Sequence, residues 1–296
     1  MEGRKMKVAL ITNYNISEKS AAAMTVAERL KEYGCRIVAP LSYRDRVERM
    51  HRHRPEMVFD IPENIYKTAD LIVVLGGDGS IMDVARNAAL RGTPVLGINM
   101  GRVGYLAELE MSELDLLDKV MKGQYTLDKR AMLKAEVISA TGKETRSAVA
   151  LNDAVISNGS IARIIDLQLS ESGVPINTYR ADGLIISTPT GSTAYSMSAG
   201  GPIADPKISC FCVTPICPHL SVARSILFPD QAVIEVKHIC RREKVLYLTL
   251  DGRTSLELMR NDVVRITKSE LEASIVRVKE CSFYEKLRQK NGGRGF

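Results

Sequence analysis

The chain has 296 residues, of which 45% are hydrophobic and 26% are charged. This balance is typical of a soluble globular protein with one large domain or two of ordinary size, and it excludes disorder, collagen-like repeats and a coiled coil as descriptions of the whole chain. No apolar run approaches the roughly 20 residues that cross a bilayer, so we expect no membrane partner.

The charge and the residue types narrow the class of ligand. The net charge is +6, only 5% of the residues are aromatic and there is no tryptophan, so a nucleic-acid surface built on base stacking is not expected. A small anionic ligand such as a nucleotide would explain the excess of positive charge equally well. The charged start of the chain leads into an apolar segment too short for a signal peptide, so we expect a cytoplasmic protein whose six cysteines are reduced thiols.

The first part of the chain alternates between strands and helices. Strands are expected at residues 8–12, 35–39, 71–75 and 94–99, and helices at residues 20–32 and from about 80 to 90. This alternation predicts a parallel sheet with helices on its faces. We therefore expect an α/β, Rossmann-like domain at residues 1–124.

After residue 124 the pattern changes to short β-rich runs. They are expected at residues 132–139, 149–157, 163–170, 184–188, 232–238, 245–250 and 263–267. Repeated short strands at this spacing predict an all-β sandwich domain, which we place at residues 125–281. The last segment, 283–291, is predicted to be a helix that returns to the first domain, so residues 282–296 are assigned to that domain.

The sharpest local feature follows the strand at residues 71–75, where Gly76, Gly77, Asp78 and Gly79 precede a helix. Ligands of open α/β sheets bind at the carboxyl ends of the strands, and glycines beside a helix start let a phosphate approach the backbone. An acid at this position is suited to act as a base or as a metal partner beside the phosphate. The alternative is a tight turn in which Asp78 or the following Ser80 caps the helix.

Two further polar segments lie in the second part of the chain. Residues 188–196 (Thr-Pro-Thr-Gly-Ser-Thr-Ala-Tyr-Ser) offer hydroxyls and backbone N–H groups that suit a ribose, a base edge or phosphates, unless they only form a Ser/Thr-rich turn. Asn152 and Asp153 interrupt an apolar β run, and buried polar groups need partners. An acid beside an amide can hold a ribose diol and an adenine edge; the alternative is a β-bulge or a strand end.

Together these segments resemble the NAD kinases, which phosphorylate the 2′-hydroxyl of the adenosine ribose of NAD to give NADP. The resemblance rests on residues 76–79, 99–106, 152–153 and 182–202, and more weakly on residues 215–219. The Gly-Gly-Asp-Gly element is shared with phosphofructokinases and diacylglycerol-type lipid kinases, whereas residues 188–195 are far more specific. The Gly-x-Gly-x-x-Gly fingerprint is absent, which disfavours an ordinary dehydrogenase.

The resemblance implies roles for individual residues. Asp78 is similar in position to the acid that accepts the proton of the 2′-hydroxyl, and the glycines Gly76, Gly77 and Gly79 would lie against phosphates. The implied substrate-binding residues are Gly79, Asn152, Asp153, Arg163, Arg180, Asp182, Thr193, Ala194, Tyr195, Ser196, Met197 and Ser198. Near the C-terminus the family usually has Asp-Gly-Gln, whereas this chain has Arg253 in the last position, which leaves that side chain to face a phosphate instead.

The resemblance also implies ligands and assembly. ATP, or alternatively polyphosphate, would be the phosphoryl donor and NAD the acceptor, with a divalent ion, Mg²⁺, bridging phosphate oxygens rather than bound in a metal site made of protein side chains. A homo-oligomer, dimer or tetramer, is expected, with no nucleic-acid partner. Two other hypotheses remain open: a lipid or sugar kinase, and a catalytically silent NAD(P) sensor.

Two clusters are assigned to structure rather than chemistry. Cys210, Cys212, Cys217 and His219 lie close together but lack the Cys-x₂-Cys spacing of a zinc knuckle. The basic run at residues 51–54 is typical of a solvated surface.

Overall fold

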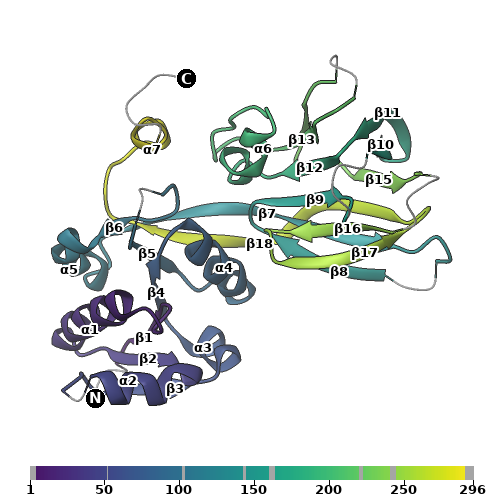
Figure 1. Ribbon diagram of the computed structural model, residues 1–296. Helices are drawn as coiled ribbons and strands as arrows, with labels where there is room; N and C mark the ends of the chain where they lie inside the picture. The colour runs from purple at the N-terminus through teal and green to yellow at the C-terminus, as the bar shows by residue number, and fades with distance from the viewer. Residues whose placement is uncertain are drawn as a thin grey trace. The chain divides into compact units, whose positions relative to one another are not determined.

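The computed structural model describes residues 5–51, 53–101, 104–142, 145–159, 164–219, 223–240 and 245–290. The chain divides into two compact units, one made of Met1–Lys129 with Ala273–Phe296 and the other of Arg130–Glu272. Two long strands, β7 (Thr126–Ile138) and β18 (Val263–Arg277), carry the chain from one unit to the other (Figure 1).

The first unit is built on a parallel sheet. Its strands are β1 (Lys7–Ile11), β2 (Arg36–Pro40), β3 (Met57–Asp60), β4 (Leu71–Gly76) and β5 (Val95–Asn99), which lie in the order β5-β4-β1-β2-β3 with every neighbouring pair parallel. β4 and β5 are buried along their whole lengths, as is typical of parallel strands covered on both faces. The predicted parallel sheet is confirmed.

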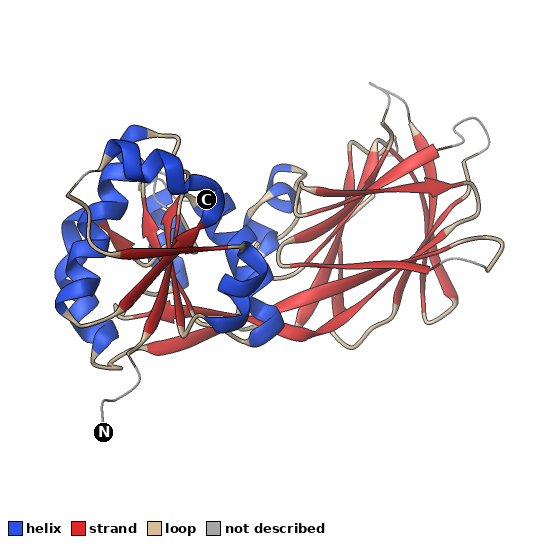
Figure 2. Cartoon of the chain, turned by 90° about the horizontal axis from the view of Figure 1, so that it is seen from below, coloured by secondary structure: helices blue, strands red, loops and turns tan. Residues whose placement is uncertain are grey.

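Helices surround this sheet (Figure 2). They are α1 (Ser17–Glu32), α2 (Arg44–Met50), α3 (Pro62–Thr68), α4 (Asp78–Ala88), α5 (Leu117–Met121) and α7 (Phe283–Lys290), and a short strand, β6 (Leu109–Glu110), extends the sheet beside β5. α1 buries the stripe Ala23, Val26, Ala27 and Leu30 in the core, as its 3.6-residue periodicity predicts. The last helix belongs to the first unit, as expected from the sequence.

The second unit is a sandwich of antiparallel strands. One layer has the order β14-β13-β12-β9-β16-β17, and the other contains β11-β10-β15-β18 with β7 and β8. Apolar side chains that alternate along these strands, such as Leu167, Leu169, Ile186 and Leu248, meet in one core. The bounds are β8 (Thr145–Ala150), β9 (Asp153–Ser157), β10 (Ile165–Glu171), β11 (Val174–Ala181), β12 (Gly183–Ser187), β13 (Cys210–Ile216), β14 (Ile226–Pro229), β15 (Ile234–His238), β16 (Val245–Leu250) and β17 (Thr254–Met259). The predicted all-β sandwich is confirmed.

Several strands differ from the sequence prediction. The single run expected at residues 149–157 is two strands, because β8 ends at Ala150 and β9 begins at Asp153. β11 was not predicted, since most of this strand at the edge of its sheet is exposed and carries no alternating pattern. β18 is three times longer than expected, because polar residues interrupt its apolar pattern after Thr267. Within the described ranges, no helix is long and apolar enough to cross a membrane.

Candidate active site

The Gly-Gly-Asp-Gly segment forms the junction between β4 and α4. β4 ends at Gly76, Gly77 is the residue before the helix, and Asp78 is its first residue. The helix thus begins two residues earlier than the sequence predicted. No side chain caps it, so the alternative in which Asp78 or Ser80 is a helix cap is wrong. The carboxylate of Asp78 has a different set of partners.

The loop that follows β5 holds the Asp78 carboxylate. Its Oδ2 accepts the backbone N–H of Tyr105 at 2.8 Å, and its Oδ1 accepts that of Leu106 at 3.0 Å. Gly104 makes this approach possible, because a Cβ at that position would lie 2.6 Å from Cγ of Asp78. The Asp78 side chain is 29% exposed. The carboxylate is therefore oriented by the backbone and still open to a ligand.

The last helix also reaches this carboxylate. Nζ of Lys290 lies 3.4 Å from Oδ2 of Asp78 and 4.0 Å from the centroid of the Tyr105 ring. The Tyr105 ring in turn packs against Phe283 at the start of α7, with 6.1 Å between ring centroids. Burial, together with the charge of Asp78, raises the pKa of the Tyr105 hydroxyl. An aromatic ring and an ammonium group thus border the acid, and the sequence analysis found neither.

A buried carboxylate anchors the C-terminal segment to the same loop. Glu108, 3% exposed, pairs with Arg277 at 3.1 Å and with Lys286 at 3.4 Å. Arg277 also donates to the carbonyl oxygens of Tyr105 and Leu106. Burial and the charge of Arg277 lower the pKa of Lys286 to about 8. This network of charges fixes the loop whose N–H groups hold the site acid.

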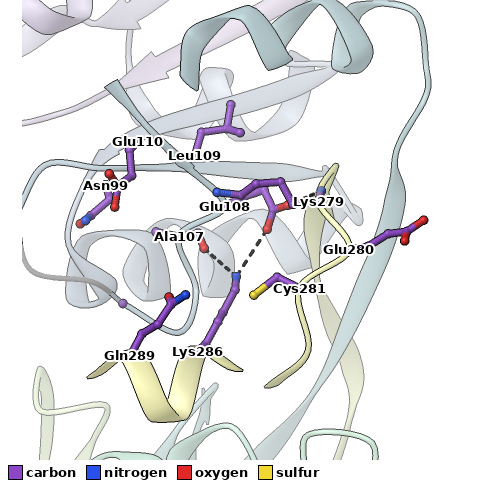
Figure 3. A pocket seen from close by; sticks show the side chains of 11 residues that line it. Asn99, Ala107, Glu108, Leu109, Glu110, Lys279, Glu280, Cys281, Lys286 and Gln289 are labelled. Atoms are coloured by element: carbon purple, nitrogen blue, oxygen red, sulfur yellow. Dashed lines mark hydrogen bonds and ion pairs between the residues drawn. The ribbon is translucent and has the colours of Figure 1, made fainter. Parts of the chain in front are cut away.

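A cavity of about 280 Å³ lies between this loop and α7 (Figure 3). Asn99, Gly104 and Glu108 line the cavity on the side of β5 and its following loop, and Lys286 and Gln289 line it on the side of α7. In Figure 3 the Lys286 ammonium is directed at the carbonyl oxygen of Ala107 and at Glu108, which it contacts at 2.9 and 3.4 Å. Within the cavity, the Lys286 ammonium and the Glu108 carboxylate therefore neutralise each other.

In the second unit, the Thr-Pro-Thr-Gly segment packs directly on the Asn152–Asp153 segment. The backbone N–H of Thr188 donates to the carbonyl oxygen of Asn152 at 2.8 Å, and its hydroxyl donates to that of Leu151 at 2.6 Å. Gly191 is necessary for this packing, because a Cβ there would lie 2.5 Å from the carbonyl carbon of Asn152. The structure thus brings together two of the segments that the sequence analysis selected.

Several hydroxyls of this segment bond to the segment itself or to a neighbouring strand. Ser192 donates to the carbonyl oxygen of Pro189 at 2.7 Å, Thr193 to that of Thr190 at 3.3 Å, and Ser196 shares a hydrogen bond with Thr214 at 3.1 Å. These side chains are buried, whereas Tyr195 is 47% exposed and Ser198 is also exposed. The hydroxyls of Ser192 and Thr193 therefore stabilise the turn, whereas the exposed side chains of the short helix α6 (Tyr195–Ser198) are open to solvent.

Asp251 organises the start of β9. Its carboxylate accepts the backbone N–H groups of Leu151, Asn152 and Asp153 at 2.9, 2.8 and 3.3 Å, and its backbone has a φ of +50°. Asp153 is the first residue of the strand, and burial together with the charge of Asp251 raises its pKa to about 7. The strand-end alternative and the ligand-binding hypothesis are compatible here. The sequence analysis missed the role of Asp251.

The remaining predicted residues are spread over the second unit. Arg180 is exposed near the end of β11, and Asp182 lies between β11 and β12, where its N–H donates to Ile216. Ala194 and Met197 are partly exposed in and beside α6. Arg163 lies outside the described residues.

Cys210 and Cys212 are buried in β13 whereas Cys217 is exposed, and no three His, Cys, Asp or Glu side chains of the described ranges are grouped as a metal site would require.

Comparisons with known proteins identify the family. Residues 8–125 match the model of the ATP-NAD kinase N-terminal domain, and residues 151–278 match that of the ATP-NAD kinase C-terminal domain. The NAD kinase of Syntrophotalea carbinolica is 45% identical over 75% of this chain and 78% of its own length. The NAD kinase of Symbiobacterium thermophilum is 37% identical over 97% of this chain and 99% of its own. The chain belongs to the NAD kinase family.

Solved structures agree with the fold of an NAD kinase. The crystal structure of yeast NADH kinase complexed with NADH has a TM-score of 0.87 at 23% identity, covering 98% of this chain and 87% of that one. An NAD kinase from Archaeoglobus fulgidus in complex with ATP has a TM-score of 0.70 at 25% identity, covering 98% of this chain and all of that one. NAD kinase membership, together with these folds, removes the reason for the lipid- or sugar-kinase hypothesis.

Proposed function

We propose that this chain transfers the γ-phosphoryl group of ATP to the 2′-hydroxyl of the adenosine ribose of NAD, giving NADP. The observation that carries the proposal is the Asp78 carboxylate: it lies at the carboxyl end of a buried parallel strand, is oriented by two backbone N–H groups and remains 29% exposed. Ligands of open α/β sheets bind at this edge. In a chain of the NAD kinase family, an acid placed in this way is the group to remove the acceptor proton.

In this mechanism Asp78 acts as the general base. Each of its oxygens accepts one backbone N–H, and Oδ2 also contacts Nζ of Lys290, so Oδ1 keeps a lone pair for the 2′-hydroxyl proton. Because the carboxylate is already held in one orientation, little reorganisation is needed when the hydroxyl attacks. A positioned base of this kind contributes about 10²- to 10⁴-fold to the rate.

The glycines around Asp78 are proposed to lie against the phosphates. Gly77 and Gly79 have open space where a Cβ would stand, so a phosphate oxygen can approach their N–H groups. The N-terminus of α4 begins at the same place, and its N–H groups and dipole favour an anion. Gly76, at the end of β4, completes this turn.

The second unit is proposed to bind NAD. Asn152 and Asp153 would hold the ribose and the base, since Oδ1 of Asn152 is buried without a hydrogen-bond partner in the described part of the chain. Such an atom is costly unless a ligand supplies a donor. The other proposed contacts are Gly79, Arg163, Arg180, Asp182 and residues 193–198, among which Tyr195 and Ser198 are exposed.

The chain's donor groups fit a divalent ion. Mg²⁺ at phosphoryl-transfer sites is usually held by one or two carboxylates together with substrate phosphates rather than by a cage of protein ligands. Asp78 supplies one accessible carboxylate beside the proposed phosphate turn. The ion would offset negative charge on the phosphate oxygens. We further propose a cytoplasmic homo-oligomer, dimer or tetramer, and leave ATP or polyphosphate as the donor to the experiment.

The test is NADP formation from NAD, ATP and Mg²⁺ by the purified protein, read through an NADP-specific dehydrogenase. We expect signal in the wild type and its loss in Asp78→Asn. NADP formation with polyphosphate but not with ATP would change only the identity of the proposed phosphoryl donor. No signal with any donor, while NAD still binds, would contradict the proposal and favour the silent sensor.

A further inference from the structure

The last helix of the chain, α7, places the ammonium group of Lys290 beside the Asp78 carboxylate. Lys290 follows Asp78 by 212 residues, yet its Nζ contacts Oδ2 of Asp78 at 3.4 Å. The Tyr105 ring also contacts this ammonium group, since Nζ lies 4.0 Å from the ring centroid. A cation–π contact of this kind holds a lysine head group without neutralising its charge.

Docking of α7 on the first unit does not need Lys290. Leu287 is 2% exposed in the core, and Phe283 packs on Tyr105. Lys286 donates to the carbonyl oxygen of Ala107 and pairs with the buried Glu108. By contrast, the Lys290 side chain is 38% exposed, so its ion pair contributes little to stability.

The acid is also held without this lysine. The N–H groups of Tyr105 and Leu106 already orient both oxygens of Asp78, at distances shorter than that of the ammonium. Lys290 thus adds positive charge, rather than orientation, at the place where negative charge grows during phosphoryl transfer. An ammonium at that place can bind the γ-phosphate of the bound donor and then offset the charge that develops during transfer.

We propose that Lys290 is a ligand of the γ-phosphate of the donor, carried to the Gly-Gly-Asp-Gly turn by the last helix. This inference rests on the proposed function. When NAD and ATP are bound, the ammonium donates to a γ-phosphate oxygen instead of to Asp78. The bond between O2′ and the γ-phosphorus then forms, the bond from that phosphorus to the bridging oxygen breaks, and its electron pair stays on ADP. Asp78 takes the hydroxyl proton, and Lys290 remains protonated throughout.

The experiment compares Lys290→Met and Lys290→Arg with Arg288→Met, a control that removes an exposed cation from the same helix. We expect Lys290→Met to lower kcat/KM for ATP by about 10²-fold, as the loss of one charge-stabilising donor does. The KM for NAD and the Tm should stay at the control values. Lys290→Arg should recover part of the loss, since it keeps the charge.

A binding measurement makes the result independent of turnover. The Mg²⁺ complex of β,γ-imido-ATP should bind Lys290→Met at least 10-fold more weakly than wild type, while the affinity for AMP, which lacks the γ-phosphate, is unchanged. Equal affinity for the imido compound in both proteins would overturn the assignment. Faster turnover in Lys290→Met would also overturn it, because it would mean that the ammonium blocks Asp78. If the wild type makes no NADP at all, the proposed function fails, and the binding difference still decides the role of Lys290.

Discussion

Replacing Gly104 by alanine tests whether the backbone orientation of Asp78 matters for the reaction. The new Cβ would lie 2.6 Å from Cγ of Asp78, whereas ordinary van der Waals contact begins at 3.4 Å. The carboxylate or the loop must therefore move by at least 0.8 Å, the difference between these two distances, because Oδ1 lies closer still to the new Cβ. Such a shift stretches the 2.8 and 3.0 Å hydrogen bonds from Tyr105 and Leu106 past the range in which a hydrogen bond is effective.

The magnitudes follow from this displacement. A reacting group misplaced by about 1 Å can lose about 10² in rate, so we expect Gly104→Ala to lower kcat by about this factor. Stability should change much less. Hydrogen bonds to a charged group contribute roughly 1.5–3 kcal/mol each when buried, but Asp78 is 29% exposed and water can replace the lost donors. We therefore expect the free energy of unfolding to fall by only about 1–2 kcal/mol.

The assay is steady-state NADP formation, with urea denaturation to measure stability. Gly101→Ala is the matched control, because it adds the same methyl group in the same loop with nothing within 4 Å of the new Cβ. The reasoning is refuted if Gly104→Ala is folded and turns over at the rate of Gly101→Ala. A large loss of stability with normal turnover of the remaining folded protein would equally show that the glycine serves folding alone.

Three other variants test the two acids and the packing of the second unit. Asp78→Asn should keep the fold and NAD binding but lose most turnover, as calorimetry and the coupled assay can show together. The pKa of Asp153 is raised to about 7, so between about pH 4 and pH 7 the folded state holds a proton that the unfolded state has released. The free energy of unfolding should therefore fall as the pH rises through this range. Denaturation of Asp153→Asn across the same range should show a smaller fall. Gly191→Ala should raise the KM for NAD and lower the Tm, because its Cβ would overlap the backbone of Asn152, and an unchanged KM would separate this contact from NAD binding.

Features with a strong local pattern were predictable from the sequence. β4 and β5 are continuous apolar runs, because both faces of a parallel strand are covered. The Gly-Gly-Asp-Gly turn could be recognised for a similar reason. Glycines and one acid directly after a buried strand are compatible with few structures other than a tight turn. Many strands of the second unit were found, but β11, most of which is exposed, and β13, which is buried, were missed.

Partners that are distant in the sequence were not predictable. Lys290 and Asp78 are 212 residues apart, and Asp251 accepts the N–H of Asn152 across 99 residues. The hydroxyls of residues 188–196 show a different limit. The same Ser or Thr side chain can bind a ligand or its own backbone turn, and only the contacts of Ser192 and Thr193 reveal that these two bind the turn.

The contacts of Asp78 and Asp251 explain how two acids of similar local sequence, each followed by glycine, come to serve different purposes. Asp251 is 7% exposed, and its carboxylate accepts three backbone N–H groups that hold the start of β9. Asp78 accepts two such groups at a more open position. Backbone donors fix both carboxylates, but only the more exposed one is open to a ligand whose proton it can take. The same turn chemistry therefore produces a structural acid in one unit and the proposed base in the other.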